Sequence, residues 1–415
     1  MAPRPRVVAP APDAARADLV PRFEDQGYEP EQIAARRRWI EERRGVALAH
    51  VGAHSIDGRA MRGNVENPIG AAQVPLGLAG PLLVNGDHAR GVFYVPFATT
   101  EGALVRSYER GMVLLSRAGG VAARVTRDEN RISPVFFLDD VGQAADLCVR
   151  LQELLPEIRA EAEATTRHGR LLRLEPRAVG REVMVHFCFT TGDAHGMNMI
   201  AKAADRACRW IVAKGLARDY LLFSGMESEK HASGSLFAGG KGKTVVAGAR
   251  LPAGLVRAYL NVEPQQLAHL WRTTVAGNVQ AGVLGYNGHF ANGLAALFIA
   301  CGQDVANLAN AAVGMTQLEL TETGDLYASV TLPALTVATV GGGTGDGTAR
   351  ECLELLGCAG DGGARQLAEI AAAALLAGEL SLGAALAAGE FVDAHEEYGR
   401  NRPEAAAESG PKPSL

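Results

Sequence analysis

The chain has 415 residues, of which 47% are hydrophobic and 21% charged, with a formal net charge of −5 at pH 7. These values are ordinary for a soluble globular protein with a large core, and they give no reason to expect nucleic acid or a membrane surface as a partner. The six cysteines are scattered without a CxxC pair, so we expect reduced, buried thiols and no metal site. The longest candidate for a membrane segment, Phe290–Cys301, is too short to cross a bilayer.

The N-terminal part is predicted to contain an unstructured segment followed by a small helical domain. Residues 1–20 mix Pro, Ala and Arg without the apolar run of a secretory signal, so we expect a disordered segment there. Glu31–Arg44 has the pattern of a charged surface helix, and we place it in a small helical domain over residues 21–60. Glycines and prolines then mark Asn67–Pro81 as a loop region.

A compact insert is predicted over residues 134–222 by the order of its apolar patterns. That order is strand, helix, strand, strand, helix, strand, which is the ferredoxin-like arrangement. Val183, Val185, Phe187 and Phe189 alternate with other residues, which predicts one core-facing side of the third strand. The expected strands are Pro134–Leu138, Arg170–Leu174, Arg181–Thr190 and Tyr220–Phe223, and the expected helices are Gly142–Ala164 and Met197–Leu216.

The remaining segments, 61–133 and 223–402, are predicted to form one large helix-rich domain, followed by a flexible tail over 403–415. Its main helices are expected at Pro264–Val275, Asn292–Ala312 and Gly363–His395. Asn292–Ala312 is apolar on almost every side, which predicts a buried helix and places Asp304 in or near the core. A buried carboxylate is costly without a partner, and Lys230 would serve as one. The alternative is a buried polar network that only holds the fold.

Isolated titratable residues of four kinds suggest proton handling at an active site. These residues are Glu101, Lys230, Asp304 and His395. Glu101 follows Thr99 and Thr100 and precedes a helical run, Ala103–Leu115, so the alternative is that a threonine caps the helix and Glu101 is merely solvated. No G-x-G-x-x-G motif follows a predicted strand and no Walker A motif is present, so a bound nucleotide would not use a Rossmann fingerprint.

Several motifs in order resemble the hydroxymethylglutaryl-coenzyme A (HMG-CoA) reductase family, in its class I type but without a membrane anchor. The resemblance covers about residues 31–400. The motifs are Glu66–Gly70 with Pro75–Pro81, Ala98–Gly102, Gly192–Met199, Gly285–Asn287 with His289, Ala300–Asp304, Thr339–Thr344 and Ala374–Gly389.

The resemblance implies an α+β fold in which a large domain with a central buried helix binds the thioester substrate. The inserted ferredoxin-like domain would carry NADPH, in agreement with the insert located from periodicity. Members of the family are homodimers or dimers of dimers with active sites at the subunit interface, and Glu66–Gly70 resembles their interface segment. We therefore expect a cytoplasmic homo-oligomer that acts on a small-molecule thioester and releases coenzyme A.

The resemblance also implies roles for the four titratable residues. The family reduces a thioester to a primary alcohol through an aldehyde, with two hydrides from NADPH. Lys230 would be the cation beside the substrate oxyanion, and Asp304 would anchor Lys230. His395 would protonate the departing coenzyme A thiolate, and Glu101 would donate a proton to the aldehyde oxygen.

The expected substrate-binding residues match the family only in part. The matching residues are Ser224 and Asn292; Glu229 and His231 replace an Asp and a Lys on either side of Lys230, and Arg131 and Arg272 stand at or next to the positions of an expected Arg and Lys. Arg131, His231 and Arg272 jointly rebuild the site for the substrate carboxylate, or else the natural substrate lacks that carboxylate or presents it differently.

For NADPH, Thr166 and Arg167 resemble the element that meets a phosphate, and Arg167 offers a charged fork suited to it. The loop that opens the helix near Met197 can present backbone N–H groups to an anion. The full expected set is Thr166, Arg167, Asp193, Gly196, Met197, Asn198, Met199, Gly341, Gly342, Gly343 and Thr344.

The favoured function is an NADPH-dependent HMG-CoA reductase that forms mevalonate for isoprenoid biosynthesis. One alternative is the same chemistry on another acyl-CoA or carrier-protein thioester in a specialised pathway. Another is a binding or regulatory protein that kept the fold without turnover, against which the retention of Glu101, Lys230, Asp304 and His395 argues.

Overall fold

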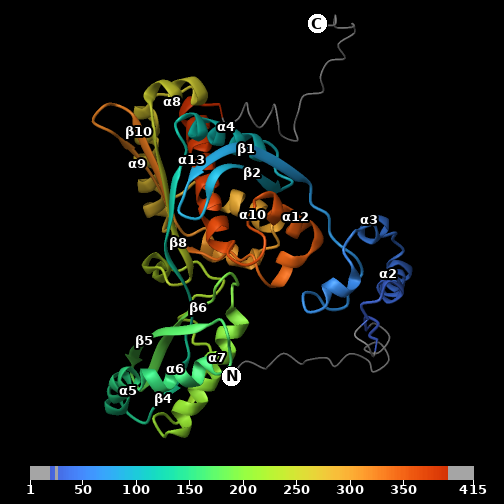
Figure 1. Cartoon of the computed structure of the whole chain (residues 1–415), viewed down its shortest axis with the longest axis vertical. Helices are drawn as coiled ribbons and strands as arrows, with labels where there is room; N and C mark the ends of the chain where they lie inside the picture. The colour runs from blue at the N-terminus through green and yellow to red at the C-terminus, as the bar shows by residue number, and fades with distance from the viewer. Residues whose placement is uncertain (1–18, 24–26, 391–415) are drawn as a thin grey trace, which may run out of the picture. The chain divides into compact units, whose positions relative to one another are not determined.

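The computed structural model describes residues 19–23 and 27–390, and the chain divides into two compact units between Val74 and Pro75 (Figure 1). The predicted disordered start, His395 and the predicted tail lie wholly or mostly outside the described residues. This division does not decide the predicted domain boundaries, which stay predictions.

The first unit is built around helix α2 (Pro30–Arg44), followed by α3 (Ala49–Gly52) and a 3-10 turn, η1 (Gly58–Met61). A capping box between Glu29 and Gln32 starts α2, and Gly45 ends it in the left-handed conformation. The Arg36 side chain is buried and donates hydrogen bonds to the carbonyls of Pro21, Gly27 and Pro68. The predicted helix is confirmed, and its arginine holds the surrounding loops together.

The second unit contains a long antiparallel sheet and a separate hairpin. Strands follow the order β7-β4-β6-β3-β8-β10-β9, with β5 paired to β6. The bounds in the larger part are β1 Leu76–Asn85, β2 Arg90–Ala98, β3 Ala122–Ile132, β8 Gly242–Leu251, β9 Met315–Leu320 and β10 Leu326–Leu335. The hairpin pairs β1 with β2, and β3 runs on to pair with β6 over Asn130–Ile132, which joins the two parts of the sheet.

Helix α13 (Ala364–Ala388) lies at the centre of this unit. It contacts α4 (Leu104–Arg117), α10 (Phe290–Ala300) and strands β8 and β10, so nearly all of its length is buried (Figure 1). The other helices of this part are α8 Ala253–Leu260, α9 Pro264–Ala281, α11 Leu308–Ala311 and α12 Gly347–Leu355, with 3-10 turns η2 Gly234–Ala238, η3 Val305–Asn307 and η4 Gly342–Gly345.

Among the described residues, α13 alone is long and apolar enough to cross a membrane, and 78% of its most apolar window is buried inside the protein. The longest apolar helix in this part of the chain is therefore α13, and the expectation that it would be Phe290–Cys301 is wrong. The burial of α13 is that of a core helix.

The predicted helix Asn292–Ala312 is wrong in its second half. Helix α10 ends at Ala300, and Gly302 adopts a left-handed conformation with φ 61°. A Cβ at Gly302 would lie 2.3 Å from the Gly343 carbonyl oxygen, so only glycine fits this turn. Asp304 then caps η3 by accepting from the Ala306 N–H, and its side chain is 43% exposed rather than buried in the core.

Residues 134–222 form strands β4 (Val135–Phe137), β5 (Arg170–Val179), β6 (Glu182–Thr190) and β7 (Asp219–Leu221) with helices α5 (Val141–Glu153), α6 (Leu155–Glu163) and α7 (Met197–Ala213). All pairings are antiparallel, in the order β7-β4-β6-β5. Val183, Val185, Phe187 and Phe189 are fully buried in one cluster, as the alternation predicted. The single helix expected over 142–164 is two helices, because Pro156 in the first turn of α6 cannot continue α5.

All six cysteines are free, as predicted. Five of them are buried and Cys148 is partly buried.

Close packing of α4 on α13 depends on glycine, and Gly111→Ala should reveal this. A Cβ at Gly111 would lie 2.0 Å from the Ala377 carbonyl oxygen. We expect this variant to lower the free energy of unfolding by about 1–3 kcal/mol, because backbone must move to admit the methyl group. Urea denaturation followed by circular dichroism measures it. Gly277→Ala in α9, with nothing within 4 Å of the added Cβ, is the matched control and should be neutral or slightly stabilising.

Candidate active site

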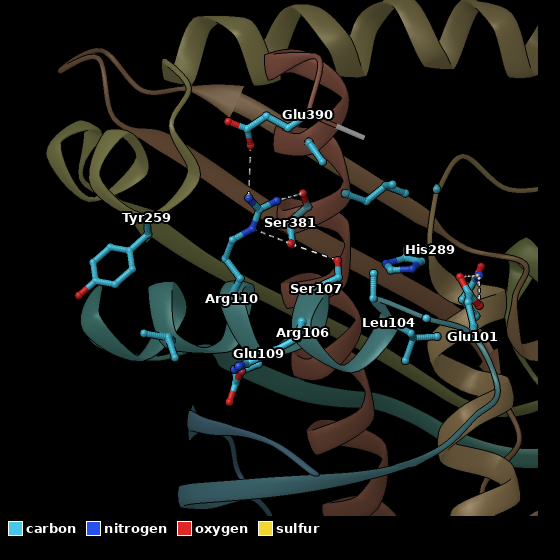
Figure 2. A pocket seen from close by; sticks show the side chains of 17 residues that line it. Glu101, Leu104, Arg106, Ser107, Glu109, Arg110, Tyr259, His289, Ser381 and Glu390 are labelled. Carbon is cyan, nitrogen blue, oxygen red and sulfur yellow. Dashed lines mark hydrogen bonds and ion pairs between the residues drawn. The ribbon is translucent and has the colours of Figure 1, made fainter. Parts of the chain in front are cut away.

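Glu101 lies in a pocket of about 730 Å³ formed by one side of α4, the start of α10 and the end of α13 (Figure 2). Its carboxylate accepts hydrogen bonds from the Asn292 amide nitrogen at 2.9 and 2.8 Å. Helix α4 begins only at Leu104, and the residue at its cap position is Ala103, in a left-handed conformation. The alternative in which Thr99 or Thr100 caps this helix is therefore wrong, and Glu101 faces the pocket.

A buried polar network holds the wall of the pocket beside Glu101. The Tyr108 hydroxyl donates to the His289 carbonyl at 2.8 Å, and the Tyr108 and His289 rings pack with centroids 4.9 Å apart. The Glu379 carboxylate on α13 accepts from the backbone N–H groups of Gly288 and His289 and from the Thr316 hydroxyl. Burial raises the pKa of Glu379, although these three donors oppose the shift, and burial lowers the pKa of His289.

Arg110 occupies the other end of the same pocket (Figure 2). Its guanidinium donates to the Ser381 hydroxyl at 2.9 Å and to the Ser381 carbonyl at 2.6 Å, and it lies 3.8 Å from the Glu390 carboxylate. Burial lowers the pKa of Arg110, and Glu390 opposes that shift. The pocket thus has a carboxylate at one end and a fixed cation at the other.

Lys230 and Asp304 form an ion pair of 2.8 Å between the ammonium and carboxylate groups. Partial burial favours the neutral form of Asp304, but the hydrogen bond and charge of Lys230 outweigh it and hold the pKa below the usual value for an aspartate. The partner that the sequence assigned to Asp304 is therefore confirmed, although the pair is half-exposed rather than buried.

A second set of charges lies next to this pair. The fully buried Lys241 ammonium contacts the Glu229 carboxylate, and Glu229 lies 3.7 Å from the His195 ring. Burial lowers the pKa of Lys241 and of His195, while the charge of Glu229 opposes both shifts. Asp304 and Lys230 also act on His195, so the two charge clusters adjoin.

The profile of the family described as hydroxymethylglutaryl-coenzyme A reductase matches residues 32–400. The chain belongs to this family.

Relatives in two archaea carry the name 3-hydroxy-3-methylglutaryl-coenzyme A reductase. The relative from Methanothermobacter thermautotrophicus is 43% identical over 89% of this chain and 94% of its own length. The relative from Methanocaldococcus jannaschii is also 43% identical, over 88% of this chain and 92% of its own.

A solved structure described as a class II 3-hydroxy-3-methylglutaryl-CoA reductase from Streptococcus pneumoniae bound to NADPH matches with a TM-score of 0.66. It covers 85% of this chain and 86% of its own at 20% identity, a level that shows the α+β fold alone. The expected class I type has no support from this structure.

The residues expected to bind NADPH in this HMG-CoA reductase family member cluster around the first turn of α7. The Thr166 hydroxyl contacts the Met199 sulfur at 3.0 Å, which places the exposed Arg167 beside that turn. Gly196 is the left-handed cap of α7, directly before Met197 and Asn198.

The glycine loop that contains Gly341, Gly342 and Thr344 lies next to the same region. The N–H groups of Thr339 and Val340 donate to the Asp193 carbonyl, and Gly343 packs on the Gly302 turn that leads to Asp304. The loop therefore lies between the start of α7 and the Lys230–Asp304 pair.

The Asp193 side chain bonds the backbone at the start of α13. Its carboxylate oxygens accept from the N–H groups of Gly362 and Ala364, where α13 begins. These bonds tie the loop before α7 to the central helix.

The expected carboxylate site is not assembled by direct contacts. The Arg131 guanidinium is buried and donates to the Gly239 carbonyl and the Ser235 hydroxyl, and the exposed His231 contacts the Glu229 carbonyl. Arg272 is exposed on α9, and the Ser224 hydroxyl accepts from the Met226 N–H. Whether these residues bind substrate stays a prediction.

Sequence reasoning missed the residues that hold the site in place. Arg110, Lys241 and Asn310 were not among the expected site residues, and His195 and Glu379 stood only within motifs of the resemblance. Ser107 and Arg110, three positions apart, had the helical spacing of one face, which could have indicated a second polar group beside Glu101. Nothing local marked Lys241, and Asn310 was marked only as a polar residue in an apolar run, because the partners of both come from distant segments.

Asp193→Ala should lower stability through the loss of the α13 cap. We expect a decrease of about 0.5–2 kcal/mol in the free energy of unfolding, the usual cost of deleting a helix N-terminal carboxylate. Asp193→Asn keeps an acceptor oxygen and should lose less. Urea unfolding of both variants measures the difference, and an unchanged Asp193→Ala protein would contradict the structural role.

Proposed function

We propose that this protein is an NADPH-dependent enzyme that reduces the HMG-CoA thioester to mevalonate and free coenzyme A. One thioester and two NADPH, with two protons, give one alcohol, one thiol and two NADP⁺. The family membership and the names of its relatives support this reaction. The observation that carries it is the placement of the Lys230–Asp304 pair beside the glycine loop, which in turn adjoins the start of α7.

Lys230 is suited to stabilise negative charge on the substrate oxygen, because its ammonium pairs with Asp304 while its side chain is 44% exposed. The lowered pKa of Asp304 keeps its carboxylate ionised at neutral pH, so a negative charge lies beside the Lys230 ammonium. Glu101, held by Asn292 at the pocket, would donate a proton to the aldehyde oxygen. His395, outside the described residues, is proposed to protonate the departing thiolate.

The start of α7 fits a phosphate-bearing dinucleotide. A helix N-terminus presents N–H groups and a partial positive charge, and Arg167, which follows Thr166 in sequence, would add a full charge. When bound there, NADPH supplies the hydrides. Thr166 and Gly196 shape the turn, while Gly341 and Gly342 would allow backbone to approach the nicotinamide end of the cofactor.

We further propose the class I type, with residues 134–222 as a ferredoxin-like cofactor domain. The strand order β7-β4-β6-β5 and the helices α5, α6 and α7 support the ferredoxin-like domain. We also propose a cytoplasmic homodimer or dimer of dimers, as the resemblance implies.

A different acyl thioester is the second candidate substrate. The environment of Arg131 favours it. The Arg131 guanidinium is buried and donates to Ser235 and Gly239, so fewer of its N–H groups are free for a substrate carboxylate than the expected site requires. Assays with several thioesters and the same cofactor separate the two candidates.

The decisive experiment follows NADPH oxidation by absorbance with purified protein and HMG-CoA. We expect two NADPH consumed per thioester, and a loss of at least about 100-fold in kcat for Lys230→Ala with NADPH affinity little changed, because the lost group stabilises developing charge. Near-normal turnover of Lys230→Ala would remove this residue from the mechanism. No turnover by the wild-type protein, with NADPH still binding, would favour another thioester.

Arg167→Ala should weaken NADPH much more than NADH. The lost partner is a phosphate group, and charge-assisted hydrogen bonds of this kind contribute about 1.5–3 kcal/mol, or roughly 10- to 150-fold in affinity. Fluorescence titration with each cofactor measures the two losses. Equal losses would mean that the phosphate binds elsewhere.

A further inference from the structure

The turn Ser228–His231, which contains Lys230, has an unfavourable backbone conformation that needs support from other segments. Ser228 has φ 56° and Lys230 has φ 58°, so two non-glycine residues are left-handed on either side of Glu229. Each such residue costs about 1–2 kcal/mol, and the conformation persists only where surrounding groups impose it.

The ion pair between Lys230 and Asp304 is too weak to impose this conformation. Both side chains are more than two-fifths exposed, and pairs of this kind contribute about 0–1 kcal/mol. The position of the Lys230 ammonium must therefore come from groups that fix the turn itself.

Asn310 on α11 fixes the backbone of the turn from one side. Its fully buried side chain accepts from the Lys230 N–H at 2.8 Å and donates to the carbonyls of Ser228 at 2.6 Å and His231 at 3.3 Å. All three bonds end on the turn, so one amide satisfies the backbone groups that the left-handed residues leave without a regular partner.

Lys241, next to the start of β8, fixes the side chain of the turn from the other side. Its fully buried ammonium contacts the Glu229 carboxylate and lies 3.4 Å from the Arg131 carbonyl. Glu229 sits between the two left-handed residues, so the anchor acts at the middle of the turn. Lys241 also lies 3.8 Å from the Met197 sulfur at the start of α7.

We infer that Asn310 and Lys241 are positioning residues that clamp the Ser228–His231 turn and thereby hold the Lys230 ammonium on Asp304. This inference rests on the proposed function, because it assigns the clamp to the reduction that Lys230 serves. Neither residue needs to touch substrate. Loosening either should misplace Lys230 without removing it.

The test compares Lys241→Met with a matched control, Lys243→Met. Lys243 is also buried, two residues along the same segment, and pairs with Asp128 at 3.1 Å instead of with the turn. We expect kcat to fall about 100-fold in Lys241→Met, the effect of a misplacement near 1 Å, with KM for NADPH changed less than about 3-fold. Lys241→Arg, which keeps a cation for Glu229, should recover at least about ten-fold of that loss.

The pH profile gives a readout that a merely structural role would not change. The charged groups that face Asp304 are Lys230 from the turn and His195 from the loop before α7. Lys230 keeps the pKa of Asp304 low, so a displaced Lys230 lets that pKa rise. The acid limb of the kcat profile should therefore move to higher pH in Lys241→Met and stay in place in Lys243→Met.

Hydrogen exchange tests the clamp independently of turnover. The Lys230 N–H that bonds Asn310 should exchange faster in Lys241→Met and in Asn310→Ala, while peptides of β8 keep wild-type protection. If Lys241→Met does not fold, Asn310→Ala replaces it in this test, because it removes a neutral amide rather than a buried charge.

Unchanged exchange over 228–231, an unchanged kcat in a folded variant, or an equal loss in Lys243→Met would each overturn the clamp. Failure of wild-type protein to oxidise NADPH with HMG-CoA would instead overturn the proposed function, and the exchange result would still decide whether the clamp exists.

Discussion

The burial of helix α13 on nearly every side is the constraint on which the rest of the large unit depends. Most of its buried side chains are small or aliphatic, and Gly111 and Gly378 allow α4 to approach closely. The polar side chains buried along it are bonded to other segments. Glu369 accepts from the turn at residues 87–89, Glu379 from the turn at 288–289, and Ser381 accepts from Arg110. The helix thus forms the core and also fixes one wall of the Glu101 pocket.

The same helix connects the pocket to the cofactor-binding region. Asp193, in the loop before α7, bonds the first N–H groups of α13 through its side chain and the glycine-loop segment through its carbonyl. Strand β3 provides a second connection by pairing with β8 and then with β6. Glu129 on β3 reinforces the junction by a two-bond contact with Arg173 of β5, which with Arg127 keeps the pKa of Glu129 low against its burial.

The charged residues of the site divide into buried ones that fix geometry and exposed ones that can meet a substrate. Glu379 and Lys241 are almost completely buried and bonded, so they set geometry. Glu101, Lys230 and Asp304 keep access to solvent, as groups that meet a substrate must. Exposed contacts alone hold the reacting groups weakly, and buried neighbours such as Asn310 and Lys241 fix the backbone that carries Lys230.

The sequence by itself determined the elements whose signal is local. The alternation in β6, the charged pattern of α2 and the order of elements in 134–222 follow from period and turn residues. The ordered motifs, among them those that contain Glu101 and Asp304, indicated the family. Only the tertiary structure decided where helices stop and which polar groups are buried. The break after Ala300 exists because Gly302 meets the Gly343 loop from forty residues away, so Asp304 lies in a turn rather than in the core. Lys241 looks like an ordinary surface residue in sequence, and Asn310 is an isolated polar residue in an apolar run. Their hydrogen-bond partners lie on distant segments that no local pattern records.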